Sequence, residues 1–123
     1  MSRSGFTLIE LIAVLAMLAV LASLSIPRFV QVDANAGRQA LVSSVAELNS
    51  RESLTWSLVK LSTTGWIDDA GVYSQLDTDL GSDFRWTPHA AIDGGNLHFK
   101  EQMLKLERES SLSTRAGKWK ERQ

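Results

Sequence analysis

FTLIELIAVLAMLAVLASLSI, residues 6–26, is the stretch of sequence that decides the fold. Its only polar residues are Thr7, Glu10, Ser23 and Ser25. As an α-helix it would span about 31 Å, close to the thickness of the hydrocarbon core of a bilayer. A chain that crosses lipid must satisfy its backbone hydrogen bonds internally, which favours a helix. We therefore expect a transmembrane helix over residues 6–27.

A short polar stub, MSRSG, precedes this helix and contains Arg3. Positive charge tends to keep its end of a membrane segment in the cytoplasm. The larger part of the chain, which follows the helix, is therefore expected on the outer side of the membrane.

Helical periodicity resumes directly after the apolar segment. Leu41, Val45 and Leu48 are spaced by four and three residues, and Leu54, Leu58 and Leu61 repeat this spacing. The sequence therefore predicts one helix from about residue 6 to residue 61, with residues 28–61 as its amphipathic half. Proline removes a backbone N–H and clashes with the preceding turn, so a kink is expected at Pro27.

Residues 62–123 have a different pattern, that of a loop followed by a small antiparallel sheet. A short helix is expected at 68–76 with Asp68 or Asp69 as its N-cap, and apolar alternation predicts strands around 84–87, 97–100 and 104–107. Turns are expected at 93–96 and near 101–102, and the tail from Ser110 to Trp119 is expected to be loosely ordered. The predicted fold is α+β: a long N-terminal helix packed on a sheet of three to four antiparallel strands.

Glu10 is the most informative residue because it places a carboxylate in an otherwise uncharged apolar helix. A charged group in the middle of a bilayer is costly and usually has a partner. Residues 6–27 contain no Lys, Arg or His. Cleavage after Gly5 would create an α-amine on Phe6, and the amine of one subunit could pair with Glu10 of the next. Alternatively, Glu10 lies at the level of the lipid headgroups and needs no partner.

The run Gly5-Phe6-Thr7-Leu8-Ile9-Glu10, followed by an uncharged helix and Pro27, resembles the prepilin cleavage and methylation signature of type IV pilins and type II secretion pseudopilins. The resemblance implies that Gly5 ends a leader peptide of residues 1–5 and that the Phe6 amine is methylated after cleavage. It further implies that Glu10 recruits subunits into a filament and that Pro27 marks a helix kink. The implied fold is pilin-like.

The same resemblance implies a structural subunit without catalytic activity. Its expected partners are other copies of itself or other pilins, a prepilin peptidase and an inner-membrane assembly platform. The precursor is expected to cross the inner membrane once, with its C-terminal domain in the periplasm, before it joins a pilus. A pseudopilin of the type II secretion system is the alternative. The absence of cysteine departs from many major pilins and fits a pseudopilin or a small pilin equally well.

A secreted soluble binding module is a third interpretation, because the small residues around Ser23-Leu24-Ser25 would also suit removal of a signal peptide. The N-terminus of the mature protein separates these cases: Phe6 indicates a filament subunit and Ile26 a secreted domain.

Asp77, Asp79 and Asp83 form a group of carboxylates of the kind that calcium prefers, and the resemblance to calcium-binding pseudopilins adds to this weak prediction. Their spacing does not fit a helix–loop–helix calcium site, and an Asp-rich turn explains them as well. No other metal site or cofactor is expected, since there is no cysteine and His89 and His98 are the only histidines.

The formal net charge of −1 gives no reason to expect nucleic-acid binding. Charge is nevertheless uneven: residues 62–99 carry six Asp and a single Arg, whereas residues 100–123 carry seven basic and four acidic side chains. An acidic middle and a basic tail could pair between copies of the chain, or they could be two solvated faces.

Overall fold

The computed structural model describes residues 5–123, apart from the side chains of residues 26–30. The chain forms two compact units, Met1–Asn35 and Ala36–Gln123. A single helix, α1, runs from Leu8 to Leu61 and contributes to both units. This confirms the long helix that the sequence predicts.

In the first unit the described side chains lie on the surface. Every side chain from Gly5 to Ser25 is exposed, and Leu8–Ser25 is long and apolar enough to cross a membrane by its length and composition. Pro27 falls within the bounds of α1, but its side chain lies outside the described residues, and the kink expected there stays a prediction.

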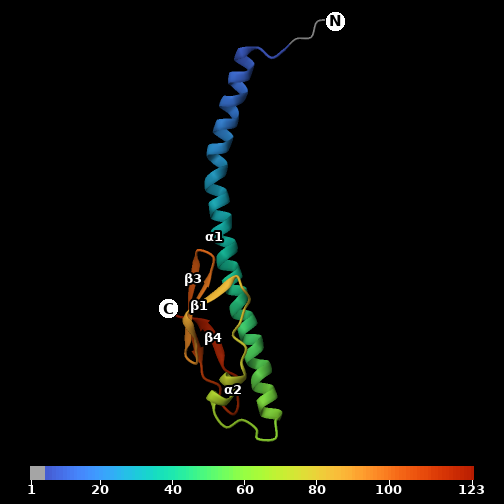
Figure 1. Cartoon of the computed structure of the whole chain (residues 1–123), viewed down its shortest axis with the longest axis vertical. Helices are drawn as coiled ribbons and strands as arrows, with labels where there is room; N and C mark the ends of the chain where they lie inside the picture. The colour runs from blue at the N-terminus through green and yellow to red at the C-terminus, as the bar shows by residue number, and fades with distance from the viewer. Residues whose placement is uncertain (1–4) are drawn as a thin grey trace. The chain divides into compact units, whose positions relative to one another are not determined.

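The second unit has two layers, in which residues 36–61 of α1 pack on one face of a four-stranded antiparallel sheet (Figure 1). The strands follow one another in the order β1-β2-β3-β4. Their bounds are Phe84–Ala91, Gly94–Phe99, Gln102–Glu109 and Lys118–Glu121. The α+β fold and the sheet of three to four strands are thus confirmed.

A hydrophobic core holds these two layers together. Leu41 and Leu48 of α1 meet side chains from the inner face of the sheet. These and the remaining buried members of the core are Leu41, Leu48, Leu76, Leu97, Leu104, Leu106 and Trp119. Alternate residues of a strand point to opposite faces, so Leu104, Leu106 and Arg108 all point toward the helix.

The amphipathic half of α1 differs from the prediction at its C-terminal end. Leu54, Leu58 and Leu61 are 62%, 60% and 85% exposed, so they are not part of the core. The buried face continues from Leu48 through Glu52 to Val59 instead. The spacing of apolar residues could not show which of these two helix faces is buried, because the buried face includes the charged residue Glu52.

The short helix α2, Asp69–Gln75, confirms the predicted helix and its cap. The backbone N–H of Gly71 donates to the Asp68 carboxylate at 2.8 Å, which satisfies one of the free donors at the helix start. The preceding residues 62–68 connect this helix to the end of α1.

The turn between β1 and β2 is shorter than expected, because β2 already begins at Gly94. Only Ile92 and Asp93 form the connection. Gly94 has φ 132°, and a Cβ there would lie 2.2 Å from the carbonyl oxygen of Leu106. This glycine therefore allows β2 to approach β3 rather than forming a turn itself.

The tail after Ser110 is ordered, and the expectation of a loose segment was wrong. Ser111 is buried, Leu112 and Arg115 form an isolated β-bridge, and β4 pairs with β3. Trp119 of β4 is only 1% exposed. The polar contacts of this tail, which no periodicity indicates, explain the difference.

Candidate functional site

The start of α1 is a reciprocal cap formed by Thr7 and Glu10. The backbone N–H of Glu10 donates to the Thr7 hydroxyl at 3.2 Å, and the backbone N–H of Thr7 donates to Glu10 Oε2 at 3.3 Å. This is the capping-box arrangement, which satisfies two of the donors that a helix N-terminus leaves free.

This cap differs from the cationic partner that the apolar surroundings of Glu10 led us to expect. The signal was present, since Thr7-Leu8-Ile9-Glu10 has the Thr-x-x-Glu spacing that is typical of such a start. The carboxylate of Glu10 therefore has a local hydrogen-bond partner within its own chain. A charged partner is still not among the described residues of this unit.

The peptide bond between Gly5 and Phe6 lies immediately before this cap. Both residues are exposed, Phe6 at 86%, and no atom lies within 4 Å of the place where a Cβ on Gly5 would be. The peptide bond between Gly5 and Phe6 is thus sterically accessible. The residues ahead of it, 1–4 of the expected leader, lie outside the described part of the chain.

The apolar part of α1 satisfies its polar groups internally. The hydroxyls of Ser23 and Ser25 donate to the carbonyl oxygens of Val20 and Leu21, each at 2.7 Å. Hydroxyls that bond to the preceding turn expose little polarity to their surroundings. This segment therefore suits an apolar environment such as lipid or a bundle of similar helices.

The three carboxylates considered for calcium lie in an exposed loop after α2. Asp77 Oδ1 accepts from the backbone N–H of Asp79, and Asp79 Oδ1 accepts from that of Gly81, both at 2.9 Å. Asp83 is also exposed. Among the described residues, no group of three or more His, Asp or Glu side chains is arranged to hold a metal ion. Calcium binding stays a prediction from sequence.

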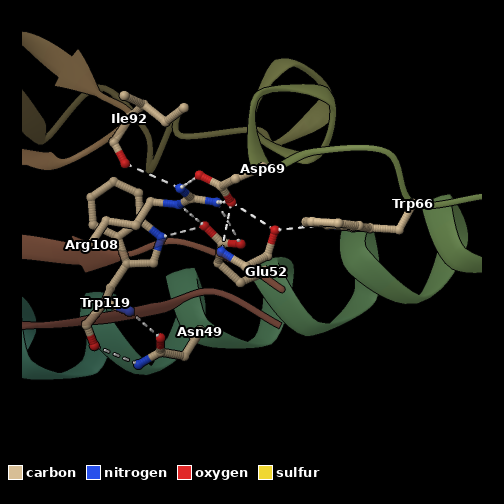
Figure 2. A network of polar contacts seen from close by, with 8 residues as sticks. Asn49, Glu52, Trp66, Asp69, Ile92, Arg108 and Trp119 are labelled. Atoms are coloured by element: carbon tan, nitrogen blue, oxygen red, sulfur yellow. Dashed lines mark hydrogen bonds and ion pairs between the residues drawn. The ribbon is translucent and has the colours of Figure 1, made fainter. Parts of the chain in front are cut away.

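A network of buried charges in the second unit is centred on Arg108 of β3 (Figure 2). Its guanidinium forms two hydrogen bonds with the Glu52 carboxylate and two with that of Asp69, the latter at 2.7 and 2.9 Å. It also donates to the carbonyl oxygen of Ile92 at 3.1 Å. The side chains of Arg108 and Glu52 are fully buried. One arginine thus connects α1, α2 and the turn between β1 and β2.

The C-terminal part of the chain joins the same network. The indole N–H of Trp119 donates to Glu52 Oε1 at 3.0 Å, and Asn49 bonds to the backbone N–H and carbonyl of Trp119 at 2.7 and 3.0 Å. Ser111 donates its backbone N–H and its hydroxyl to Asp69 Oδ1, each at 2.7 Å. No buried side-chain nitrogen or oxygen within the described residues lacks a partner.

Gly117 lies against this ion pair. A Cβ on this residue would come within 3.0 Å of Glu52 Oε2 and 3.1 Å of Arg108 Nη2. The chain can therefore pass this close to the buried charges only because position 117 carries no side chain.

The network changes the pKa values of its members. Burial alone would raise the pKa of Asp69, but hydrogen bonds from Arg108 and Ser111 outweigh it and lower the pKa below its usual value of 3.8. Burial would lower the pKa of Arg108, and its bonds to Asp69 and Glu52 more than reverse this and raise it. The ionised forms of Asp69 and Arg108 are therefore favoured near neutral pH.

Arg108 belongs to the basic tail of residues 100–123, and its buried network was not predicted from the sequence. A signal was present, because Arg108 continues the inward alternation of Leu104 and Leu106. Glu52 similarly falls on the helix face of Leu41 and Leu48. The charges of the tail are thus not all solvated.

Comparison with known proteins gives one match, over residues 1–26, to the prokaryotic N-terminal methylation motif. No curated protein and no solved structure matches the chain. The matched residues contain the Gly5–Phe6 bond, the Thr7–Glu10 cap and most of the apolar segment, whereas the sheet and the Arg108 network lie outside them. The chain therefore carries, at its N-terminus, the motif that is the signature of type IV pilins and pseudopilins.

Proposed function

We propose that this chain is a structural subunit of an extracytoplasmic filament of the type IV pilus kind. It is cut after Gly5 and assembles through its N-terminal helix. The observation that carries this proposal is the methylation motif together with the start of α1, residues 8–25, where every apolar side chain is exposed. Those side chains find their partners outside the chain, first in lipid and then in copies of the same helix.

The geometry around Glu10 allows a contact between copies in addition to the local cap. A carboxylate offers about four lone-pair sites on two oxygens, and the cap uses Oε2. Oε1 is then free to accept from the amine that cleavage creates on Phe6 of a neighbouring copy. Such an ion pair within an apolar bundle would fix the axial register of the two helices.

We further propose which proteins act on the chain and where it lies before and after assembly. A prepilin peptidase cuts and methylates the precursor, which crosses the inner membrane once with residues 36–123 on the periplasmic side. An inner-membrane assembly platform then moves the helix from lipid into the filament. The apolar area that the helix buries changes little in this step, so packing and charge pairing determine the geometry. The chain acts throughout as a building block, not as an enzyme.

A pseudopilin of the type II secretion system is the second candidate, since the absence of cysteine departs from many major pilins and fits a pseudopilin or a small pilin equally well. Filaments outside the cell would support the pilus. A secretion defect on deletion, without such filaments, together with a calcium-dependent rise in the melting temperature, would support the pseudopilus.

N-terminal sequencing of the mature protein tests the processing step. We expect Phe6, methylated, as the first residue, and we expect Gly5→Val to block cleavage because a branched side chain replaces the exposed glycine. A mature protein that begins at Ile26 would instead show a secreted domain and refute the proposal.

Two variants of Glu10 separate its charge from its role as a cap. Glu10→Leu removes both, whereas Glu10→Gln keeps a side-chain oxygen that can accept from the Thr7 N–H. We expect both variants to insert into the membrane and both to fail in assembly, because each lacks the negative charge. Normal filaments from Glu10→Gln would show that only the cap matters and would contradict the proposed ion pair.

A further inference from the structure

The outer face of the sheet in the second unit has no covering element among the described residues. Trp119 and Arg108, which pair across β3 and β4, point toward the helix. Their neighbours in each strand therefore point outward. The outward charged residues of the four strands are Arg85, Lys105, Glu107, Glu109, Lys118 and Lys120.

This outer face has an excess of positive charge. Lys120 is neutralised by an ion pair with Glu109 at 2.7 Å, which raises the pKa of the lysine. Lys105 and Lys118 are exposed and form no ion pair within the described part of the chain. Arg122, also exposed, extends the positive charge past the end of β4.

The opposite charge lies in the Asp-rich loop, defined here as residues 76–83. Asp77, Asp79 and Asp83 are exposed, and Asp68 is exposed at the start of α2. Arg51 of α1 donates to the carbonyl oxygens of Asp77 and Asp79, at 3.1 and 2.7 Å, and forms an ion pair with the Asp77 carboxylate at 3.7 Å. Asp79 and Asp83 therefore carry the unpaired negative charge of the loop among the described residues. The bonds from Arg51 and the two carboxylate-capped turns hold the loop in a defined shape against the helix.

The two charged surfaces are on opposite layers of the unit. The Asp-rich loop lies beside α1 (Figure 1). The basic side chains lie on the other side of the sheet, because Arg108 and Trp119, their neighbours along the strands, point toward α1. The loop of one chain therefore cannot cover the sheet of the same chain. A second copy can supply the complementary charge. Because the contact joins the loop of one copy to the sheet of another, each end of the assembly still has an unused loop or sheet that can bind a further copy.

We propose that the outer face of the sheet, around Lys105 and Lys118, is a docking surface for the Asp-rich loop of a second copy of this chain. The contact is heterologous, so it propagates into an open polymer instead of closing into a dimer. The inference rests on the proposed filament function and names the contact between the outer domains. Exposed ion pairs are individually weak, so this contact sets orientation and register while the helices supply most of the cohesion.

Disulfide trapping tests the docking directly, since the chain has no cysteine of its own. The full chain with Asp79→Cys and Lys105→Cys, oxidised in the cell that makes it, should give a ladder of dimers, trimers and larger species. Either single variant should give no ladder. Dimers from Lys105→Cys alone, with no ladder from the double variant, would show a symmetric contact between sheets and overturn the proposal.

Charge reversal provides a second test. Lys105→Glu with Lys118→Glu should reduce filament yield at least tenfold, and Asp79→Asn with Asp83→Lys, which keeps an acceptor oxygen at position 79, should do the same. Combining all four changes should restore yield to within about threefold of the original. If reversing the loop has no effect while reversing the sheet does, the basic face binds another anionic surface, such as the membrane, and the proposal fails.

These outcomes are separable from failure of the proposed function. A mature N-terminus at Phe6 and assembly that depends on Glu10, together with full assembly of the sheet-reversed variant, would refute the docking surface alone. Lack of cleavage after Gly5 would instead refute the filament function itself.

Discussion

The two ends of helix α1 each carry a glutamate on an apolar face, and the two are stabilised in opposite ways. Glu10 is exposed, and the one partner of its carboxylate within the described residues is the backbone N–H of Thr7, three residues away. Glu52 is fully buried and bonds to Arg108 and Trp119, more than 50 residues away in sequence. In the first unit the apolar side chains and Glu10 are exposed, whereas the charged groups of the second unit's network are paired with one another. One end of α1 thus belongs to the packed core, and the other end is the segment for which we propose a role in assembly.

The largest effect should come from Arg108→Leu. This variant leaves the carboxylate of Glu52 buried without its cation, which costs about 3–5 kcal/mol of the free energy of unfolding. Chemical denaturation of the full chain in detergent, followed by tryptophan fluorescence, would measure this loss. Arg115→Leu, at an exposed arginine in the same tail, is the matched control and should change stability by less than about 0.5 kcal/mol.

Membrane insertion and cleavage after Gly5 should be unaffected by Arg108→Leu, because the first unit makes no use of the network. Equal stability of the Arg108→Leu and Arg115→Leu variants would show that pairing Glu52 with Arg108 contributes nothing to the free energy of unfolding.

The next effect compares two leucines of the same helix. Leu48→Ala removes a fully buried side chain and should destabilise the second unit by about 2–5 kcal/mol. Leu54→Ala removes a side chain that is 62% exposed and should cost much less, within about 0.5 kcal/mol. The same denaturation assay measures both. A comparable loss for Leu54 would place it in the core, as its helical spacing first indicated.

The smallest effect is a dependence of stability on acid. The pKa of Asp69 is lower in the folded state than its usual value of 3.8, so ionised Asp69 stabilises the fold above that pH. The contribution is lost as pH falls from about 4 through the lower, folded-state pKa. Melting temperatures between pH 3 and 7 should show this decline, and Asp69→Asn should reduce it. If the melting temperature of Asp69→Asn falls with pH as much as that of the original chain, other carboxylates are responsible for the pH dependence.

Much of the fold follows from local patterns in the sequence. Residues 6–26 are so uniformly apolar that they predict a helix without any tertiary information, and Phe84, Trp86, Leu97 and Leu104 mark strands by alternation. The cap of α2 by Asp68 was also predictable, because N-caps depend only on residues three positions apart. The motif around Gly5 and Glu10 belongs to this class, since all its elements are adjacent in sequence.

The contacts that could not be predicted join residues far apart in sequence. Whether Arg108 is solvated or buried depends on carboxylates of Glu52 and Asp69, 56 and 39 residues away. Leu54 and Leu48 have equivalent patterns, and only the position of the sheet decides which of them is covered. The ordered conformation of the tail likewise depends on a distant contact, in which the Ser111 hydroxyl donates a hydrogen bond to Asp69.

Gly117 provides a way to recognise relatives that the matched N-terminal motif cannot distinguish. A Cβ at position 117 would crowd the carbonyl oxygen of Glu109 at 2.9 Å as well as the Glu52–Arg108 pair, so a side chain there should disturb both β3 and the buried charges. Homologues that share this domain and its buried ion pair should therefore keep a glycine nine residues after the arginine. A search of uncharacterised sequences for that joint pattern would trace the lineage of the outer domain independently of the anchor that precedes it.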